Sequence, residues 1–160
     1  VREYCGDLMK MLSAKGQDRG VIFGIGDPVP SLAEFCRSYS QALRTVDLAS
    51  RICDERIATY RRYILCELIY DSPNAKLALI QRIKPLLAYD EEHNTQLLYT
   101  LETYFNNCQN SVKTSKALFI HRNTLLYRLD RIAEILDLNY NDSEQMLTFQ
   151  LALKAFLMCQ

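Results

Sequence analysis

The feature that most limits the possible folds is a run of apolar residues at helical spacing between positions 121 and 136. At about 100° per residue, this run falls within about a third of the helix circumference; its members are Leu125, Leu126, Leu129, Ile132, Ala133 and Leu136. The opposite side of the same segment is polar and carries Asn123, Thr124, Tyr127, Arg128 and Arg131. One apolar and one polar face are typical of a helix packed on a core. The pattern therefore predicts a helix from near His121 to about Leu136, with its polar groups facing outward.

A shorter predicted helix comes directly before this one. It spans about Ser111 to Leu118, and only Phe119 and Ile120 separate it from the next helix. Two helices joined by so few residues form a helix-turn-helix, whose second helix can enter the major groove of DNA. The connection lacks the glycine that many such units use, and Phe119 occupies that region. A further helix is predicted from Asp142-Ser143 to the end of the chain.

The N-terminal third is predicted to combine helices with a small β-rich part. Helical spacing predicts a helix over residues 2–15, ended by Gly16. Short strands are predicted at residues 21–26 and, as a second candidate, at residues 56–62. Between them, Ser31-Leu32-Ala33-Glu34 is a capping box that is expected to open a long helix.

The middle of the chain is predicted to be helical throughout. Helices are expected over residues 63–70 and 74–87, with Pro85 bending or ending the second of them. Asp90-Glu91-Glu92 favours a helix N-terminus, where carboxylates meet the positive end of the helix dipole, and that helix is expected to reach about Asn107. The fold class is therefore mainly α, with a helix-turn-helix bundle at the C-terminus and a small α+β remnant of two short strands at the N-terminus.

Charge is balanced overall but uneven along the chain. Nineteen basic and nineteen acidic residues cancel, so the net charge indicates no class of partner. The stretch from Tyr89 to Cys108 holds four acids and no Lys or Arg, whereas the stretch from Ser111 to Arg128 holds four bases and no acid. The predicted helix-turn-helix is thus a local positive segment, as expected for a surface that meets phosphates.

The six cysteines favour reduced thiols over a disulfide framework or a zinc site. No C-x-x-C pair occurs, and Cys36, Cys53, Cys66 and Cys108 fall within apolar helical patterns, where they are expected to be buried. No signal peptide is visible, and no apolar run approaches the ~18 residues of a membrane span. We therefore expect a cytoplasmic protein with no membrane segment, no metal and no cofactor.

The sequence offers little for catalysis. Gly24-Ile25-Gly26 lies between a strand and a helix, as in a dinucleotide-binding loop, but Val29 stands where the third glycine belongs, between two prolines. A turn at the end of the strand is the better interpretation. His93 and His121 lie in different helices without an acidic or cysteine partner at ligand spacing. We predict that this chain is not an enzyme, unless active-site residues lie upstream of it.

The C-terminal region resembles a known family. The segments "TLETYFNN", "SKALFIHRNTLLYRLDRIAEILDL" and "LTFQLALKAFLM" resemble the C-terminal DNA-binding domain of bacterial PucR/CdaR-type transcriptional regulators, which is marked by an "H-R-N-T-L-x-Y-R-L" run, here residues 121–129. In that family a bulky residue before "H-R-N-T" is usual, as at Phe119. The N-terminal region, residues 21–49, more loosely resembles the degenerate GGDEF-like domain that precedes this module. The cyclase signature is absent, so no diguanylate cyclase activity is expected.

The resemblance implies a regulator that binds a double-stranded DNA operator as a homodimer, with a small-molecule effector bound by an upstream domain. Chemistry then suggests the roles. Asn123 and Arg128 are expected to read base edges, and Thr124 and Tyr127 to bond phosphates or a base. The full predicted DNA-binding set is Lys113, Thr114, Lys116, Arg122, Asn123, Thr124, Tyr127, Arg128 and Arg131. His121 is expected to cap the helix or fix the turn rather than contact a base.

Three segments are predicted: residues 1–62 as part of the GGDEF-like domain, residues 63–96 as connecting helices, and residues 97–160 as the helix-turn-helix domain. The main interpretation is a regulator that reads the major groove, and two alternatives to it remain open at this point. In the first, the chain is a non-enzymatic helical module for dimerisation or protein docking, whose basic face recruits an acidic protein. In the second, a catalytic or nucleotide-binding domain lies upstream.

Overall fold

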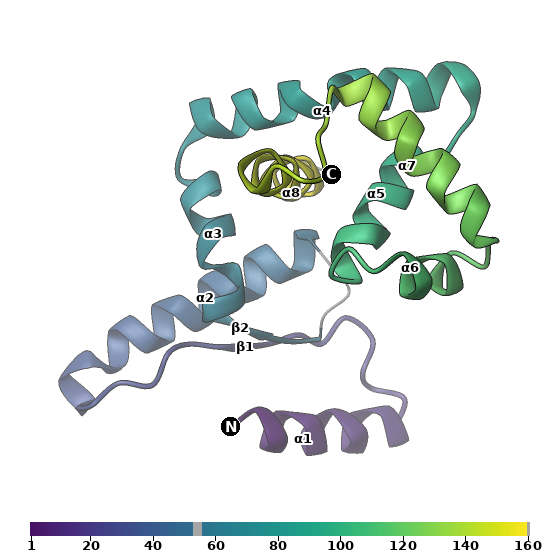
Figure 1. The fold of residues 1–160 in the computed structure, drawn as a ribbon. Coiled ribbons are helices and arrows are strands. Elements are labelled where there is room, and N and C mark those ends of the chain that lie inside the picture. The colour runs from purple at the N-terminus through teal and green to yellow at the C-terminus, as the bar shows by residue number, and fades with distance from the viewer. Residues whose placement is uncertain (53–55, 160) are drawn as a thin grey trace. The chain divides into compact units, whose positions relative to one another are not determined.

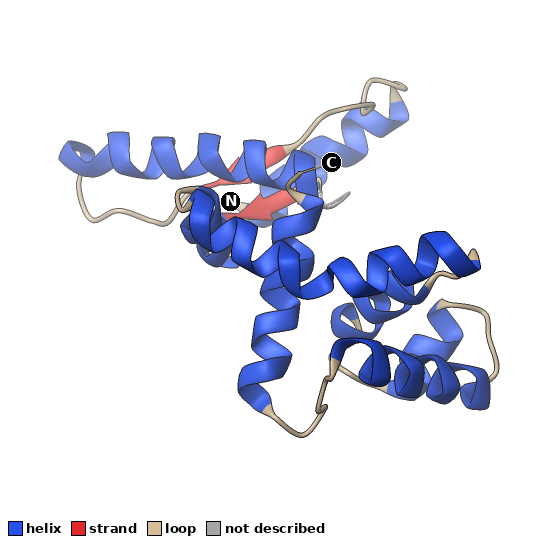
Figure 2. Cartoon of the chain, turned by 90° about the horizontal axis from the view of Figure 1, so that it is seen from above, coloured by secondary structure: helices blue, strands red, loops and turns tan. Residues whose placement is uncertain are grey.

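The structure is a computed structural model that describes residues 1–52 and 56–159. Within these residues it contains eight α-helices and two short strands, so the expected mainly α class is confirmed. Figure 2 shows how small the strand content is beside the helices. Contacts divide the chain into two compact units, residues 1–72 with the residues from Leu157 onward, and residues 73–156. We describe each unit by itself.

The first unit is built around a two-stranded parallel sheet. β1 (Phe23–Ile25) pairs with β2 (Ile57–Thr59), with Phe23 opposite Ile57. α1 (Arg2–Ala14) ends where Gly16 adopts a φ of 66°. α2 (Phe35–Ile52) lies along the sheet (Figure 1), and α3 (Tyr60–Tyr70) follows β2 without a loop. Both predicted strands exist, but each is shorter than expected.

The two glycines of the Gly24-Ile25-Gly26 segment allow α2 to approach the backbone of β1. A Cβ atom at Gly24 would lie 2.2 Å from the carbonyl oxygen of Ala42, and one at Gly26 would lie 2.0 Å from that of Ser38. Any side chain at either position would therefore push α2 away from the strand. These glycines serve helix–strand packing, so the segment is neither a nucleotide loop nor merely a turn.

The predicted capping box at Ser31 does not form. Residues Leu32–Glu34 make a 3₁₀ turn, η1, in which the Glu34 N–H bonds the Ser31 carbonyl at 3.2 Å, and α2 begins only at Phe35. The Ser31 side chain makes no capping bond. The tight i→i+3 geometry of this first turn replaces the expected reciprocal side-chain bonds.

The prediction for the middle of the chain was wrong at the α4–α5 junction. α4 spans Pro73–His93 and continues through Pro85, which lies on an exposed side where water can reach the unpaired backbone carbonyl. The acids from Asp90 onward therefore end α4 instead of opening the next helix. The Asp90 carboxylate still caps α5 (Leu97–Asn106), because it accepts the Leu97 and Leu98 N–H groups at 2.8 Å each.

The second unit packs four long helices and one short helix around a single apolar core. α6 (Ser111–Ala117), α7 (Arg122–Leu136) and α8 (Ser143–Leu157) lie close to their predicted bounds. The core contains Ile83 and Leu86 from α4, Leu97 and Leu101 from α5, Leu125, Leu129, Ile132 and Leu136 from α7, and Met146, Phe149, Ala152 and Leu153 from α8. The predicted stripe on α7 is confirmed at Leu125, Leu129, Ile132 and Leu136, whereas Ala133 is half-buried and Leu126, at the margin of the buried face, is 40% exposed. α4, expected only as a connection, thus contributes to this core.

Helices in the second unit end without glycine. All five glycines of the chain lie within residues 6–26. The left-handed positions that follow α4, α5, α6 and α7 are occupied by Asn94, Cys108, Phe119 and Asp137, with φ values between 50° and 55°. All four of these side chains are exposed.

The cysteines follow the predicted pattern only in part. Cys5 and Cys66 are buried, whereas Cys36 and Cys108 are exposed, contrary to expectation. Cys108 is exposed because α5 ends before it, so it lies in a turn and not on an apolar helical face. Cys53 lies outside the described residues. Among the described helices none is long and apolar enough to cross a membrane.

Candidate nucleic-acid interface

The short helix α6 is held in place by Asn110 at its N-terminus. The Asn110 side-chain oxygen accepts the backbone N–H groups of Val112 at 3.1 Å and Lys113 at 3.0 Å. An asparagine at this position satisfies donors that a helix of two turns would otherwise leave to water. α6 packs against α5 and α7, so the cap helps to fix the entry into the turn.

The turn between α6 and α7 has the hydrogen bonding of a Schellman motif. The Phe119 N–H bonds the Lys116 carbonyl at 3.2 Å, and the Ile120 N–H bonds the Ser115 carbonyl at 3.0 Å. In this motif the first residue beyond the helix end must adopt a left-handed conformation. Here that residue is Phe119, with a φ of 55°. Ile120 packs against the core, while the Phe119 side chain is 95% exposed.

His121 is the N-cap of α7, as expected from its position. Its Nδ1 atom accepts the Asn123 N–H at 3.2 Å. This bond requires an unprotonated Nδ1, because a doubly protonated imidazole has no acceptor. His121 therefore sets the start of α7 and orients its first turn, which holds Arg122, Asn123 and Thr124, three of the nine predicted DNA contacts.

The exposed polar residues gather at the start of α7 and on α6. Arg122, Asn123 and Thr124 are exposed in the first turn of α7, and Tyr127 is 71% exposed one turn later. On α6, the side chains of Lys113 and Lys116 are exposed as well. No carboxylate within the described part of the chain forms an ion pair with Lys113, Lys116 or Arg122.

Arg128 is held inside the second unit. Its Nη1 atom donates to Thr100 Oγ1 on α5 at 3.1 Å, and the Thr100 hydroxyl in turn donates to the Gln96 carbonyl at 2.7 Å. Thr100 is fully buried and Arg128 is half-buried. The guanidinium predicted to read a base thus links α7 to α5 in this structure.

Arg131 is similarly held by its neighbours. Its Nε donates to the Tyr89 hydroxyl at 3.2 Å, and its Nη1 atom donates to Glu134 Oε2 at 2.7 Å. The bonds to the Tyr89 phenol and to Glu134 also raise the pKa of the Arg131 guanidinium, which stays charged in any case. Its charge is largely balanced by Glu134, one turn further along α7.

Thr114 does not belong to the surface. It is fully buried, and its hydroxyl donates to the Asn110 carbonyl at 2.8 Å. Thr114 follows exposed Lys113 on the same helix, and the rotation of about 100° between them turns Thr114 toward α7. The prediction that Thr114 contacts DNA is therefore corrected.

Two residues of this region were not predicted as functional. Asn110 was overlooked, although an asparagine directly before a helical pattern is a recognised N-cap signal. Phe119 was interpreted only as a residue that stands in place of a turn glycine. The exposure of its side chain was not predicted, because sequence spacing does not tell whether other elements cover a turn residue.

Comparison with known proteins identifies this region. Residues 97–155 match the family model of the PucR C-terminal helix-turn-helix domain. The chain is 30% identical over 154 residues to the carbohydrate diacid regulator of Escherichia coli (strain K12), an alignment that covers 96% of the chain and 40% of that relative. It is 32% identical over 134 residues to the proline-responsive transcriptional activator PutR of Bacillus subtilis (strain 168), covering 76% of the chain and 31% of that protein. The purine catabolism regulatory protein of the same organism is 39% identical over 69 residues, which are 42% of the chain and 13% of the relative. The chain thus spans well under half the length of each of these relatives.

Proposed function

Residues 97–155 belong to the PucR C-terminal helix-turn-helix family, and the chain is part of a PucR/CdaR-type transcriptional regulator rather than an enzyme. From this family we propose that the chain binds an operator in double-stranded DNA with sequence specificity. The start of α7 enters the major groove in this proposal, and α6 crosses the backbone. The observation that carries it is the exposed cluster of Arg122, Asn123, Thr124 and Tyr127 at the start of α7. The two exposed lysines of α6 have no carboxylate partner among the residues that the structure describes.

The exposed side chains divide by their chemistry. The Asn123 amide suits the N6 and N7 edge of adenine, and Thr124 and Tyr127 bond a base or a phosphate. Arg122, Lys113 and Lys116 neutralise phosphates without reading sequence. Arg128 and Arg131 act through their bonds to Thr100 and Tyr89, which hold α7 against α5 and α4.

The wider role follows from the relatives, which are a carbohydrate diacid regulator, a proline-responsive transcriptional activator and a purine catabolism regulatory protein. We propose that this regulator controls catabolic genes, acts in the cytoplasm as a homodimer on two related half-sites, and responds to a small-molecule effector bound outside residues 1–160. The N-terminal unit corresponds in this proposal to part of a degenerate GGDEF-like domain.

The test is to select duplexes from a random-sequence library with the full chain and to measure their affinity by fluorescence anisotropy. Asn123→Ala is expected to lose about 1–3 kcal/mol on the selected duplex and to relax sequence preference. Asn74→Ala, at an exposed position on α4, is the matched control. A selection that enriches no sequence, together with retention of acidic proteins on the basic face, would instead favour the docking-module alternative.

The second test concerns salt. Lys116→Ala is expected to weaken binding to all duplexes alike and to reduce the slope of log K against log salt by about 1. Lys84→Ala, at an exposed position on α4, is the control and should leave the slope unchanged. Equal slopes for both variants and the wild type would remove Lys116 from the interface.

A further inference from the structure

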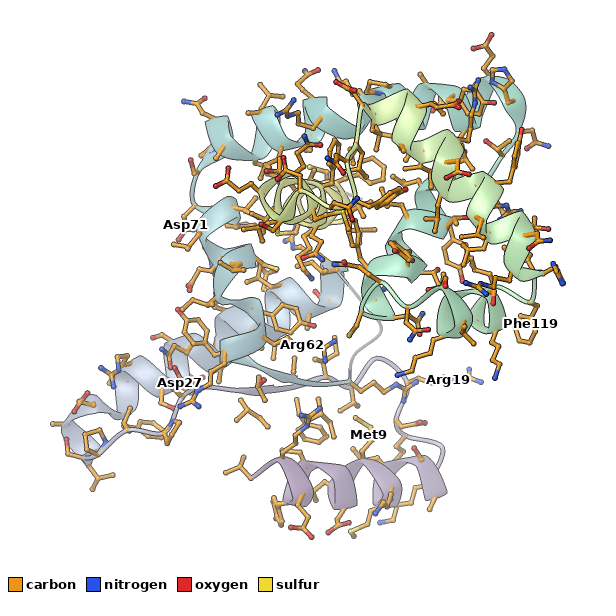
Figure 3. The ribbon with its side chains drawn as sticks, in the orientation of Figure 1. Met9, Arg19, Asp27, Arg62, Asp71 and Phe119 are labelled. Atoms are coloured by element: carbon orange, nitrogen blue, oxygen red, sulfur yellow. The ribbon has the colours of Figure 1, made fainter. Side chains whose placement is uncertain are left out.

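Phe119 is the residue of the helix-turn-helix whose exposure the fold does not explain. Its side chain is 95% exposed, the largest exposed fraction among the large apolar residues of the described chain. Figure 3 labels it at the outer edge of its unit, at the connection between α6 and α7. An isolated exposed apolar residue is common, but this one lies within the proposed DNA-binding surface.

The backbone of this turn does not need the phenyl ring. Both bonds of the Schellman motif are donated by backbone N–H groups, those of Phe119 and Ile120, and the apolar contact with the core comes from Ile120. A φ of 55° is unfavourable for any residue with a Cβ and is unfavourable for phenylalanine in particular, whereas glycine adopts it freely. The ring therefore occupies a position that disfavours it and contacts no core in return.

The surroundings of Phe119 point to a polyanion as its partner. Lys116 precedes it by three residues and Arg122 follows it by three, and both are exposed and without a carboxylate partner in the described part of the chain. No acidic residue occurs from Ser111 to Arg128. Duplex DNA combines a negative backbone with one apolar group in the major groove, the C5 methyl of thymine, which phenylalanine is able to contact.

We propose that Phe119 packs its ring against the C5 methyl of a thymine at the edge of the site bound by α7. Phe119 lies two residues before His121, the N-cap of α7, and the first residues of such a helix are those that meet base edges. The contact makes Phe119 a specificity-determining residue for thymine at one operator position. This inference rests on the proposed function, since it requires that α7 enter the major groove.

The experiment uses the full chain and the duplex selected above. Each thymine is replaced in turn by deoxyuridine, which keeps the base pair and removes only the methyl group. At one of these positions, replacing thymine by deoxyuridine is expected to weaken the binding of the wild-type protein about fourfold. This is the affinity that follows from burying one methyl group. Phe119→Gly removes the ring and suits the turn, so this variant should bind the original duplex about fourfold more weakly than wild type does. Its affinity should not fall further when deoxyuridine replaces the thymine at that position. Phe119→Tyr keeps the ring and should retain the thymine preference.

Three outcomes would overturn the proposal. The first is binding of Phe119→Gly within about twofold of wild type; the second is equal deoxyuridine losses in both proteins at every thymine; the third is loss of the thymine preference in Phe119→Tyr. Thermal unfolding of each variant excludes a folding defect as the cause. If wild type binds no duplex at all, the proposed function fails, and that result is distinct from any of the three.

Discussion

At the scale of single residues, the backbone conformation of Phe119 has a measurable consequence for stability. An L-residue in the left-handed region costs roughly 1–2 kcal/mol, and here no burial offsets that cost because the side chain is exposed. Phe119→Gly is therefore expected to raise the free energy of unfolding of the second unit by about 1 kcal/mol in urea titrations.

Phe119→Ala serves as the control for that measurement. It removes the same ring but keeps a Cβ in the left-handed conformation, so its stability should stay within about 0.5 kcal/mol of wild type. A glycine variant no more stable than the alanine variant would show that the conformation of the turn is not the source of the cost.

His121 provides a second prediction at this scale. His121→Ala removes the acceptor for the Asn123 N–H and is expected to lower the free energy of unfolding by about 1 kcal/mol. His121→Asn supplies a good N-cap oxygen and should restore it. If alanine and asparagine unfold at the same denaturant concentration, the Nδ1 bond does not contribute to stability.

At the scale of the helices, the bond between Arg128 and Thr100 joins α7 to α5. Thr100→Val keeps the shape of the side chain but removes the acceptor, and it is expected to cost about 1 kcal/mol of stability. If Arg128 positions α7, then Arg128→Ala and Thr100→Val weaken binding to all duplexes, and the double variant loses no more than the larger single loss.

A different result would restore Arg128 as a base reader. In that case Thr100→Val would leave DNA binding unchanged, whereas Arg128→Ala would relax sequence preference at one guanine. Competition assays with duplexes mutated at single positions separate these two outcomes.

Helix prediction succeeded where apolar spacing and local signals agreed, and it failed where a local signal had two meanings. The bounds of α6, α7 and α8 follow from their apolar faces. Asp90-Glu91-Glu92 was assigned to a helix start, yet Asp90 caps α5 from the last turn of α4. A carboxylate beside free N–H groups looks the same in the sequence whether it belongs to the next helix or the preceding one. Only the three-dimensional path of the chain distinguishes them.

The candidate site was predicted in the same uneven way. Side-chain chemistry and the helical wheel placed Asn123, Thr124 and Tyr127 on the outer face of α7, where the structure exposes them. The wheel also placed Arg128 and Arg131 there, but their long side chains turn toward α5 and α4. A wheel describes the direction of the Cβ and not the neighbours that a long side chain reaches.

At the scale of the whole molecule, Glu102 makes stability depend on pH. Burial raises the pKa of its carboxyl above the ordinary 4.5, although Lys154 opposes the shift. Between pH 4.5 and the raised pKa, the native state keeps a proton that the unfolded state has lost, so this group makes stability fall as the pH rises through that window. Glu102→Gln is expected to be more stable than wild type at pH 7, with the difference shrinking toward pH 4. Parallel stability curves from pH 4 to 7 would exclude this role.

The helix-ending positions of the second unit have a further consequence for how such a domain changes over evolution. Because Asn94, Cys108, Phe119 and Asp137 occupy positions that glycine often fills, each of these four corners displays a side chain to solvent. Their hydrogen bonds are made by the backbone, so the identity of each side chain can vary without loss of the helix end. A domain of this construction can acquire new surface chemistry at its corners, including the one beside α7, while its core and its helices remain unchanged.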